Sequence, residues 1–301
     1  MACSATGKSR RRQFRSSARD QGGPTMSDAA STGRIEEGED EPKSSQVVLR
    51  VERLEKHFGG ITAVDGASFE VERGTLTGLI GPNGAGKSTT FNCITGTHEP
   101  DGGTVVFEDR EITGMEPHEV AHEGLARTFQ IPRELSAMTV LENLMLAPLD
   151  QPGEKLWRSV APGARSSVKA DESEILERSW DMLEFFDIDH LATEEAGNLS
   201  GGQRKLLELA RVLMTDPDMV LLDEPFAGVN PTLEKKLLGH IHDLRDDGYT
   251  FLIVEHDMDL IMNNCERVLV MHQGSILADG TPEEIKDNER VVEAYLGGEI
   301  E

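Results

Sequence analysis

A glycine-rich stretch between an apolar run and a helical pattern constrains the fold of this chain most strongly. Residues 81–88 read Gly-Pro-Asn-Gly-Ala-Gly-Lys-Ser and fit the pattern G-x-x-x-x-G-K-[ST]. The apolar run 75–80 predicts a strand before the stretch, and residues 87–95 predict a helix after it. Glycines in such a turn let successive backbone N–H groups point at a phosphate, and the helix N-terminus adds a favourable dipole. The sequence therefore predicts a phosphate-binding loop rather than an ordinary strand–turn–helix connection.

The loop provides the first candidate binding residues. We expect the Lys87 ammonium to reach the β- and γ-phosphates of a nucleotide, and the Ser88 hydroxyl to ligate Mg²⁺. The candidate nucleotide contacts in this segment are Gly81, Asn83, Gly84, Gly86, Lys87, Ser88 and Thr89.

A second motif combines a buried strand with two acids. Residues 219–222 are four consecutive apolar residues, and Asp223 and Glu224 follow them directly. A buried strand delivers such carboxylates from its C-terminal end to the crevice that holds the loop. We expect Asp223 to hold Mg²⁺, directly or through water, and Glu224 to act as the general base that polarises the attacking water. Acids commonly follow buried strands, so this motif gains its meaning from the loop that precedes it.

The stretch Leu199-Ser-Gly-Gly-Gln203 is the most specific of the three motifs, because five given residues in this order rarely arise by chance. Ser200 can cap the helix predicted after it, and the two glycines expose backbone N–H groups at the positive end of that helix. A plain helix cap would explain the serine but would not require Gly-Gly-Gln. We therefore expect a second phosphate-binding helix end, formed by Ser200, Gly201, Gly202 and Gln203.

Together, the three motifs resemble those of the ATP-binding subunits of ABC transporters, and the resemblance covers roughly residues 47–298. It implies an α/β fold of the P-loop NTPase type over residues 47–301, with a parallel-sheet ATPase core and an antiparallel β portion near the N-terminus. A helical subdomain is expected as an insertion over about 131–215. The resemblance also implies MgATP as the ligand and a head-to-tail dimer, in which the signature 199–203 completes the ATP site of the opposite subunit.

The same resemblance implies roles for three further residues. Phe58 is in the place of an aromatic that stacks on adenine, Gln130 is expected to contact Mg²⁺ or the attacking water, and His256 is expected to hydrogen-bond the γ-phosphate. Without the resemblance, Phe58 would be interpreted as a core residue and His256 as an ordinary histidine at a strand end. Asn230 departs from the pattern, because many family members have aspartate there. Its missing carboxylate weakens the expectation of a charged contact across the dimer.

Four segments, 227–231, 126–130, 255–258 and 294–297, are similar to one branch of the family, the importer subunits for branched-chain amino acids. For this branch we expect an ATPase on the cytoplasmic face of the cell membrane that drives uptake through separate permease subunits. A sister or identical ATPase subunit completes the dimer, and an extracellular substrate-binding protein delivers the solute. An importer of urea or another small solute stays open, as does a soluble ABC ATPase of DNA repair or translation. A regulatory module that does not hydrolyse ATP is disfavoured, because all the expected catalytic side chains are present.

The composition excludes several other classes of protein. The formal net charge of −25 is unfavourable near phosphate backbones, so nucleic acid is not an expected partner. Three scattered cysteines fit neither a disulfide framework nor a cysteine-rich zinc site, and indicate a reducing cytoplasm. No apolar run approaches the roughly 18–20 residues that span a bilayer, and the basic start lacks the apolar segment of a secretory signal. We therefore expect a soluble cytoplasmic chain that docks on a membrane protein.

Residues 1–46 are polar, have no apolar periodicity, and are predicted to be a disordered tail. Within this tail, residues 1–25 are basic, with a net charge of +5. We interpret them as a solvated tail, or as untranslated sequence before a start at Met26. The alternative is a patch that binds anionic lipid or nucleic acid.

The patterning also predicts elements along the rest of the chain. Residues 148–170 include three prolines and are predicted to be a loop. Residues 173–186 are predicted to form an amphipathic helix whose Leu176, Trp180 and Leu183 pack in the core. Further strands are predicted at 47–51, 67–71, 104–107, 219–222, 250–254, 268–271 and 275–278, and further helices at 139–147, after Ser200, at 232–246 and near the C-terminus.

The acid surplus lies outside the basic start, because residues 26–301 carry a net charge of −30. Acidic surfaces with few lysines, ten here against twenty arginines, suit a cytoplasm of high salt, where ions screen the repulsion. We interpret the composition as adaptation to a halophilic cell, the alternative being an acidic protein of an ordinary one.

We predict that the isolated protein is more stable in high salt than in dilute buffer, because screening relieves the repulsion between its carboxylates. Melting temperatures measured across a potassium chloride series should rise steeply. A flat series would contradict the adaptation to salt.

Overall fold

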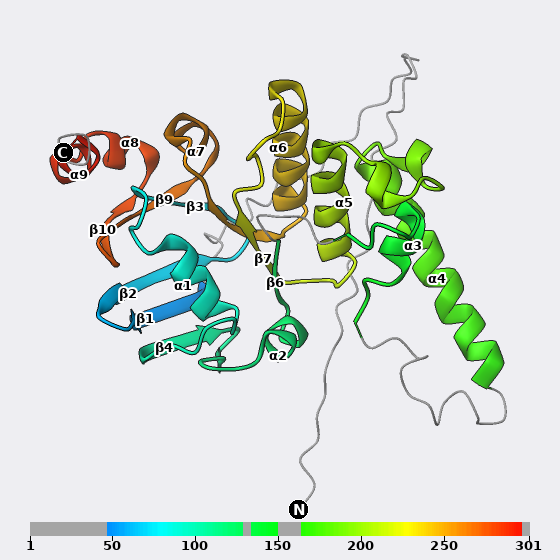
Figure 1. Ribbon diagram of the computed structural model, residues 1–301, viewed down its shortest axis with the longest axis horizontal. Helices are drawn as coiled ribbons and strands as arrows, with labels where there is room; N and C mark the ends of the chain where they lie inside the picture. The colour runs from blue at the N-terminus through cyan, green and yellow to red at the C-terminus, as the bar shows by residue number, and fades with distance from the viewer. Residues whose placement is uncertain (1–46, 129–133, 150–163, 297–301) are drawn as a thin grey trace, which may run out of the picture.

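Two β-sheets pack around a shared apolar cluster that includes the helix after the phosphate-binding loop, α1 (Lys87–Ile94) (Figure 1). The computed structural model describes residues 47–128, 134–149 and 164–296. The tail predicted for 1–46 and the candidate Gln130 lie outside the described residues.

A six-stranded sheet forms the centre of the fold. Its strands lie in the order β10 (Ser275–Gly280), β9 (Arg267–His272), β3 (Leu76–Ile80), β8 (Thr250–Val254), β7 (Met219–Asp223) and β6 (Leu125–Arg127). All neighbouring pairs are parallel except the hairpin of β9 and β10. β3, β7 and β8 are buried along their whole length, because a parallel sheet covered on both faces is built from continuous apolar runs. The strands predicted at these three places are confirmed.

Alternate residues of the central strands point to two apolar clusters, one on each face of the sheet. In β8, Ile253 belongs to one cluster and Val254 to the other, as the two-residue repeat of a strand requires. The second cluster joins the sheet to α1 and to the antiparallel sheet. The first joins it to helices on the opposite face, among them α5 (Gly201–Leu213), α6 (Pro231–Asp246) and α7 (Met258–Asn264).

The second sheet is antiparallel, with strands in the order β2 (Ile61–Glu72), β1 (Val47–Phe58), β4 (Gly102–Phe107) and β5 (Arg110–Glu111). The predicted strands 47–51 and 67–71 are parts of the longer β1 and β2, which continue to a tight hairpin at residues 59–60. Gly59 has a φ of 58°, a left-handed conformation that favours glycine in such a turn.

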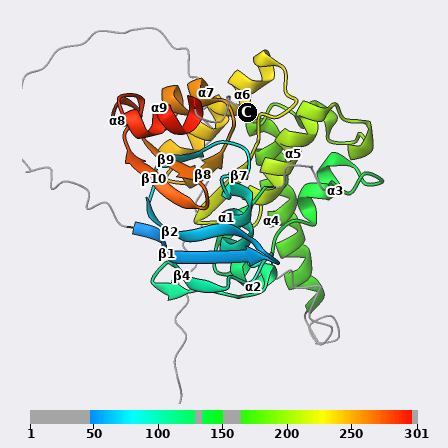
Figure 2. The same cartoon turned by 60° about the vertical axis from the view of Figure 1, so that its left-hand side comes forward.

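A group of helices lies beside the sheets, at the right of Figure 1 and again at the right of Figure 2. It contains α3 (Val140–Met145), α4 (Ala164–Phe185) and α5, and no strand is assigned within residues 134–149 and 164–213. Shorter helices complete the chain at α2 (Pro117–His122), α8 (Pro282–Lys286) and α9 (Glu289–Leu296). Across the described ranges, we find no helix with the length and apolarity that crossing a membrane requires.

Two predictions in the helical group were wrong. The predicted loop 148–170 ends too late, because α4 begins at Ala164. The predicted core face of α4 is also wrong in part. Leu183 is buried, but Leu176 and Trp180 are 37% and 38% exposed. The buried face instead contains Ser179, Met182 and Leu183. Ser179 can lie there because its hydroxyl donates to the carbonyl of Ile175 at 2.7 Å, which a count of apolar residues does not register.

Candidate nucleotide-binding site

The three central strands bring the predicted motifs to one edge of the sheet. β8 lies between β3 and β7, and the register aligns Val254 with Leu79 on one side and with Asp223 on the other. The glycine-rich loop therefore leaves the sheet beside Glu255 and His256, which in turn follow the strand next to the acidic pair. In parallel sheets, ligands bind at this carboxyl edge.

Close backbone contacts explain two glycines of the loop. A Cβ atom on Gly81 would lie 2.1 Å from the carbonyl oxygen of Met271, and one on Gly86 would lie 2.4 Å from that of Ala63. Gly86 is also the N-cap of α1, with a φ of 103° and no side-chain cap. The first backbone N–H groups of α1 are therefore not capped by a side chain, and are available to an anion.

Lys87 lies under the loop rather than in solvent. Its side chain is buried, and Nζ donates to the carbonyl oxygens of Gly81 at 2.6 Å and Pro82 at 3.2 Å. Burial lowers the pKa of Lys87, and the nearby Glu224 raises it in part. The ammonium and the general-base candidate thus act on each other across the site. Ser88 follows at the start of α1 and is exposed.

Asp223 ends β7 and is only 5% exposed. Its Oδ2 accepts a hydrogen bond from Arg127 Nη2 at 2.6 Å, and its backbone N–H donates to Thr128 Oγ1 at 3.3 Å. Sequence reasoning gave Arg127 no role. The signal in the sequence was an arginine inside a strand-like run, because a charge buried in a strand needs an acidic partner.

Glu224 is held from several directions. Its φ is 49°, a left-handed conformation that is uncommon for a residue with a side chain. The backbone N–H donates to the Val254 carbonyl at 3.0 Å, and the carbonyl oxygen accepts from Lys205 Nζ at 2.8 Å. Oε1 lies 2.6 Å from Nε2 of His256, whose side chain is half exposed. The structure therefore brings these two candidates together, with His256 contacting Glu224.

Two further residues around the acidic pair were missed by sequence reasoning. Glu255 is buried, and its two carboxylate oxygens accept from the backbone N–H groups of Phe226 at 3.0 Å and His256 at 3.2 Å. Burial raises the pKa of Glu255 and lowers that of Lys205. Lys205 is in α5, so this helix reaches from the signature to the backbone of Glu224.

The signature begins α5 with a reciprocal cap. The Ser200 hydroxyl accepts from the Gln203 backbone N–H at 3.4 Å, and Gln203 Oε1 accepts from the Ser200 N–H at 2.9 Å. A Cβ on Gly202 would lie 1.9 Å from Leu233 Cδ2, whereas one on Gly201 would meet nothing within 4 Å. Capping and packing thus explain the serine, the glutamine and one glycine, whereas the sequence suggested that a cap would explain the serine alone. Gly201 is the position left open to a close-approaching group.

Phe58 and Asn230 have clear local surroundings. Phe58 ends β1 with 44% of its surface exposed, and its ring packs edge-on against His98 at 5.3 Å between centroids. An exposed aromatic of this kind can offer a face to a planar base. Asn230 is the N-cap of α6, and its Oδ1 accepts from the N–H groups of Thr232 at 3.1 Å and Leu233 at 3.0 Å.

The oxygen donors at this edge fit Mg²⁺ better than they fit a transition metal. Ser88 and Asp223 offer a hydroxyl and a carboxylate, and Mg²⁺ is commonly bound by one or two such groups together with substrate phosphates. Within the described ranges, no group of three or more His, Cys, Asp or Glu side chains could chelate a metal by itself. The third candidate ligand, Gln130, lies outside the described residues.

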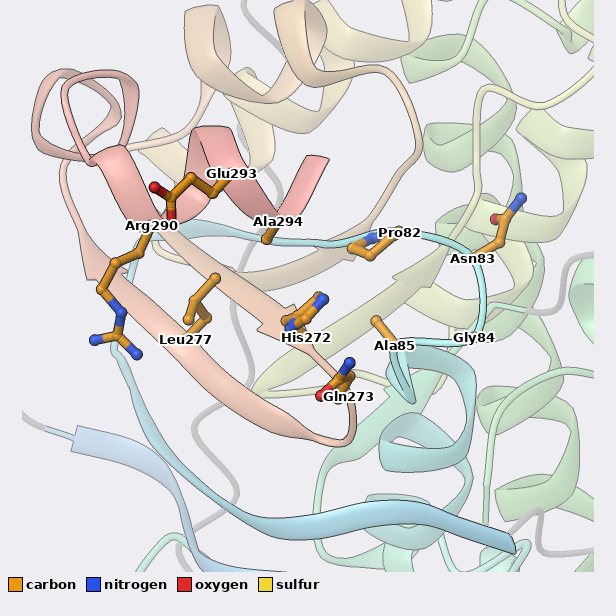
Figure 3. A pocket seen from close by; sticks show the side chains of 10 residues that line it. All are labelled: Pro82, Asn83, Gly84, Ala85, His272, Gln273, Leu277, Arg290, Glu293 and Ala294. Carbon is orange, nitrogen blue, oxygen red and sulfur yellow. The ribbon is translucent and has the colours of Figure 1, made fainter. Parts of the chain in front are cut away.

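A cavity of about 630 Å³ adjoins the loop on its outer side. Figure 3 shows the segment Pro82–Ala85 on one side of it, and Arg290, Glu293 and Ala294 of α9 on the other. The floor is formed by His272, Gln273 and Leu277. Neither Asp223 nor Glu224 is among the lining residues. The cavity is therefore a neighbour of the site rather than its chemical centre.

Comparisons with known proteins agree with this geometry. Residues 64–227 match the family described as ABC transporter. Residues 275–301 match the one described as branched-chain amino acid ATP-binding cassette transporter. The chain is 44% identical over 252 residues to the probable branched-chain amino acid transport ATP-binding protein LivG of Archaeoglobus fulgidus, covering 84% of this chain and 96% of the relative. It is 41% identical over 256 residues to the high-affinity branched-chain amino acid transport ATP-binding protein BraF of Pseudomonas aeruginosa, covering 84% and 99%.

Solved structures give the same result. A nucleotide-free ATP-binding cassette from an ABC transporter superposes with a TM-score of 0.71 at 43% identity, covering 83% of this chain and 99% of that one. An ATP-binding cassette in its ADP conformation gives a TM-score of 0.72 at 42% identity, covering 84% and 100%. The predicted mixed α/β fold, with a parallel core and antiparallel strands, is confirmed. The chain belongs to the ABC transporter family, as one of its ATP-binding ATPase chains.

Proposed function

We propose that this chain is the ATP-binding subunit of an importer for branched-chain amino acids, and that it hydrolyses MgATP in a head-to-tail dimer. The main support is the convergence of the loop, the acidic pair and His256 at the carboxyl edge of β3, β8 and β7. The solute is proposed from the names of the relatives LivG and BraF and from the C-terminal match at residues 275–301.

Phosphate binding is assigned to the loop and the start of α1. Lys87 carries its ammonium beneath the loop, where it neutralises the β- and γ-phosphates, and the uncapped N–H groups of α1 add further donors. When bound, Mg²⁺ would neutralise further phosphate charge, held by Ser88, Asp223 and Gln130. Phe58 is the proposed platform for adenine.

Glu224 is the proposed general base. Its carboxylate is aligned by His256 at 2.6 Å, and its backbone is held by Val254 and Lys205. A carboxylate fixed in this way can accept a proton from a water that attacks the γ-phosphate. We assign His256 a second contact, with the γ-phosphate, and Gln130 the orientation of the attacking water. Most of the rate enhancement then comes from positioning and charge neutralisation.

The signature is proposed to act on the nucleotide of the opposite subunit. α5 belongs to the helical group, while α1 packs with the two sheets (Figures 1 and 2). The open position at Gly201 allows a phosphate to approach the start of α5 closely. In a head-to-tail dimer each ATP would lie between one loop and the other subunit's Ser200–Gln203, so that ATP holds the dimer closed.

The proposed partners are permease subunits, a sister or identical ATPase subunit, and an extracellular substrate-binding protein that acts through the permease. The names of the relatives support a place beside a transport pathway. We therefore propose that the chain is a peripheral protein at the cytoplasmic face of the membrane.

We predict that Lys87→Ala weakens ATP binding by about 10- to 100-fold while the fold survives, because charged hydrogen bonds to the phosphates are lost. Equilibrium binding of a fluorescent ATP analogue measures the effect, with melting temperature as the test of folding. Lys286→Ala, a change of an exposed lysine in α8, is the matched control and should bind as the parent does. Unchanged affinity in Lys87→Ala would remove the assignment of the loop.

Glu224→Gln and Asp223→Asn should separate the base from the metal ligand. Glu224→Gln keeps the size of the side chain but not its basicity, so ATP should bind and close the dimer without being hydrolysed. Asp223→Asn should weaken metal binding, and so impair both closure and turnover. Size-exclusion chromatography with ATP and Mg²⁺, with the sister subunit added if homodimers do not form, should show a stabilised dimer only for Glu224→Gln.

The control for this pair is Glu283→Gln, at an exposed position of α8. It should hydrolyse ATP at the parent rate. Hydrolysis at the parent rate by Glu224→Gln would show that Glu224 is not the base.

The transport proposal is tested by reconstitution with any permease subunits and substrate-binding protein that neighbouring genes encode. Proteoliposomes whose ATPase subunits face the lumen, and which enclose ATP there, should accumulate leucine, isoleucine and valine. The variant Glu224→Gln should abolish this uptake. Uptake of urea but not of these amino acids would move the chain to another importer branch. Neighbouring genes of DNA repair or translation, in place of permease genes, would contradict an importer.

A further inference from the structure

Arg127 is a largely buried cation at the end of β6, with its side chain 11% exposed. Nη2 donates to Asp223 Oδ2 at 2.6 Å, while Nη1 donates to Asn92 Oδ1 at 2.6 Å and to Thr95 Oγ1 at 3.3 Å. The guanidinium also lies 5.7 Å from the centroid of the Phe91 ring. It thus joins the proposed metal-binding acid to α1, the helix that starts in the phosphate-binding loop.

The charge of Asp223 needs this partner. The aspartate is 5% exposed, so water solvates its carboxylate poorly. Lys205 also acts on Asp223 electrostatically, but its ammonium donates to the carbonyl of Glu224. Within the part of the chain that the structure describes, the guanidinium of Arg127 is the cation that donates a hydrogen bond to Asp223.

The surroundings of Arg127 that the structure describes provide partners for its Nη groups but not for all of its hydrogen-bond donors. Its Nε atom is buried and has no partner among the described residues. An unpaired buried donor is costly, and a residue that served only to fill space here would not need one. The position is compatible with a role for the Nη groups, which face Asp223 and α1.

The backbone around Arg127 is tied to the same aspartate. Arg127 is in register with Leu221, two residues before Asp223, and the next residue, Thr128, accepts from the Asp223 N–H. Gln130 follows three residues after Arg127. The strand that leads to the proposed water-orienting glutamine is therefore attached to the proposed metal ligand through both side chain and backbone.

We propose that Arg127 is the counter-ion of Asp223, sharing with Mg²⁺ the neutralisation of this carboxylate, and so sets how strongly nucleotide binding depends on the metal. This inference rests on the proposed function, in which Asp223 is a ligand of Mg²⁺. Without Mg²⁺, the guanidinium keeps the carboxylate from repelling the nucleotide phosphates. With Mg²⁺, most of that repulsion is already removed. Arg127 is thus a positioning residue for the acid and not a catalytic one.

The test is the affinity of the full chain for ADP, measured by calorimetry at one ionic strength, with saturating Mg²⁺ and with EDTA. ADP avoids turnover, so the readout does not depend on activity. In Arg127→Met, the dissociation constant in EDTA should rise by about tenfold or more, and the one in Mg²⁺ should change by less than about threefold. Arg127→Lys keeps the charge and should stay near the parent in both buffers.

Two further variants separate the counter-ion role from a structural one. Arg73→Met removes another ion-paired arginine, the partner of Glu108, and should leave both constants unchanged. The double change Arg127→Met with Asp223→Asn buries no lone charge, and should restore the affinity in EDTA to about that of the parent. If Arg127→Met alone does not fold, the double variant must still fold and bind ADP in EDTA.

The outcomes distinguish the inference from the function on which it rests. Equal weakening of ADP binding in both buffers by Arg127→Met, or no recovery in the double variant, would overturn the counter-ion role. A parent protein that binds no ADP in either buffer would instead overturn the proposed function. If the parent protein has the same dissociation constant for ADP with Mg²⁺ and with EDTA, the assignment of Asp223 as a metal ligand would be overturned.

Discussion

The register of three buried strands determines the candidate nucleotide site. β3, β8 and β7 are neighbours, and Val254 is aligned with both Leu79 and Asp223. A shift of one residue in either pairing would turn alternate side chains to the opposite apolar cluster, and both clusters are closely packed. The loop, the acidic pair and His256 are thus fixed relative to one another by packing that lies entirely outside the site. Packing in the interior therefore determines the geometry of the side chains at this edge of the sheet.

The site also shows how an acidic chain keeps a binding place for polyphosphate. The chain as a whole has a net charge of −25, yet Lys87, Arg127 and Lys205 converge around the acidic pair. Each cation is held by carbonyl or carboxylate oxygens rather than by exposed surface. Ions in solution screen exposed charges far more than buried ones, so the attraction of these three cations for phosphate is retained in salt that masks the outer surface.

Much of the fold and part of the site could be predicted from the sequence, for identifiable reasons. Buried parallel strands are continuous apolar runs, so β3, β7 and β8 were recognised almost to the residue. Gly81 and Gly86 of the loop mark backbone contacts that exclude a Cβ, and such contacts leave a sequence pattern. The roles of the site residues stay predictions, and Gln130 lies outside the described residues.

Other features depend on contacts between distant segments and leave little trace in one sequence. The pairing of Arg127 with Asp223 joins residues 96 positions apart. The burial of Ser179 and the exposure of Trp180 depend on how α4 is turned against its neighbours, which apolar spacing alone does not decide. Gln203 was interpreted only as a part of the signature, although its distance from Ser200 is also that of a capping box.

The cap of α6 has an evolutionary consequence. Asn230 accepts two backbone N–H groups, and asparagine and aspartate are about equally good in this role. Exchange between them is therefore nearly neutral for the folded subunit. Selection at this position can then act on contacts with other chains, because neither residue changes the stability of the fold. Drift between the two residues therefore adds or removes one negative charge at the start of α6 with little effect on the stability of the fold.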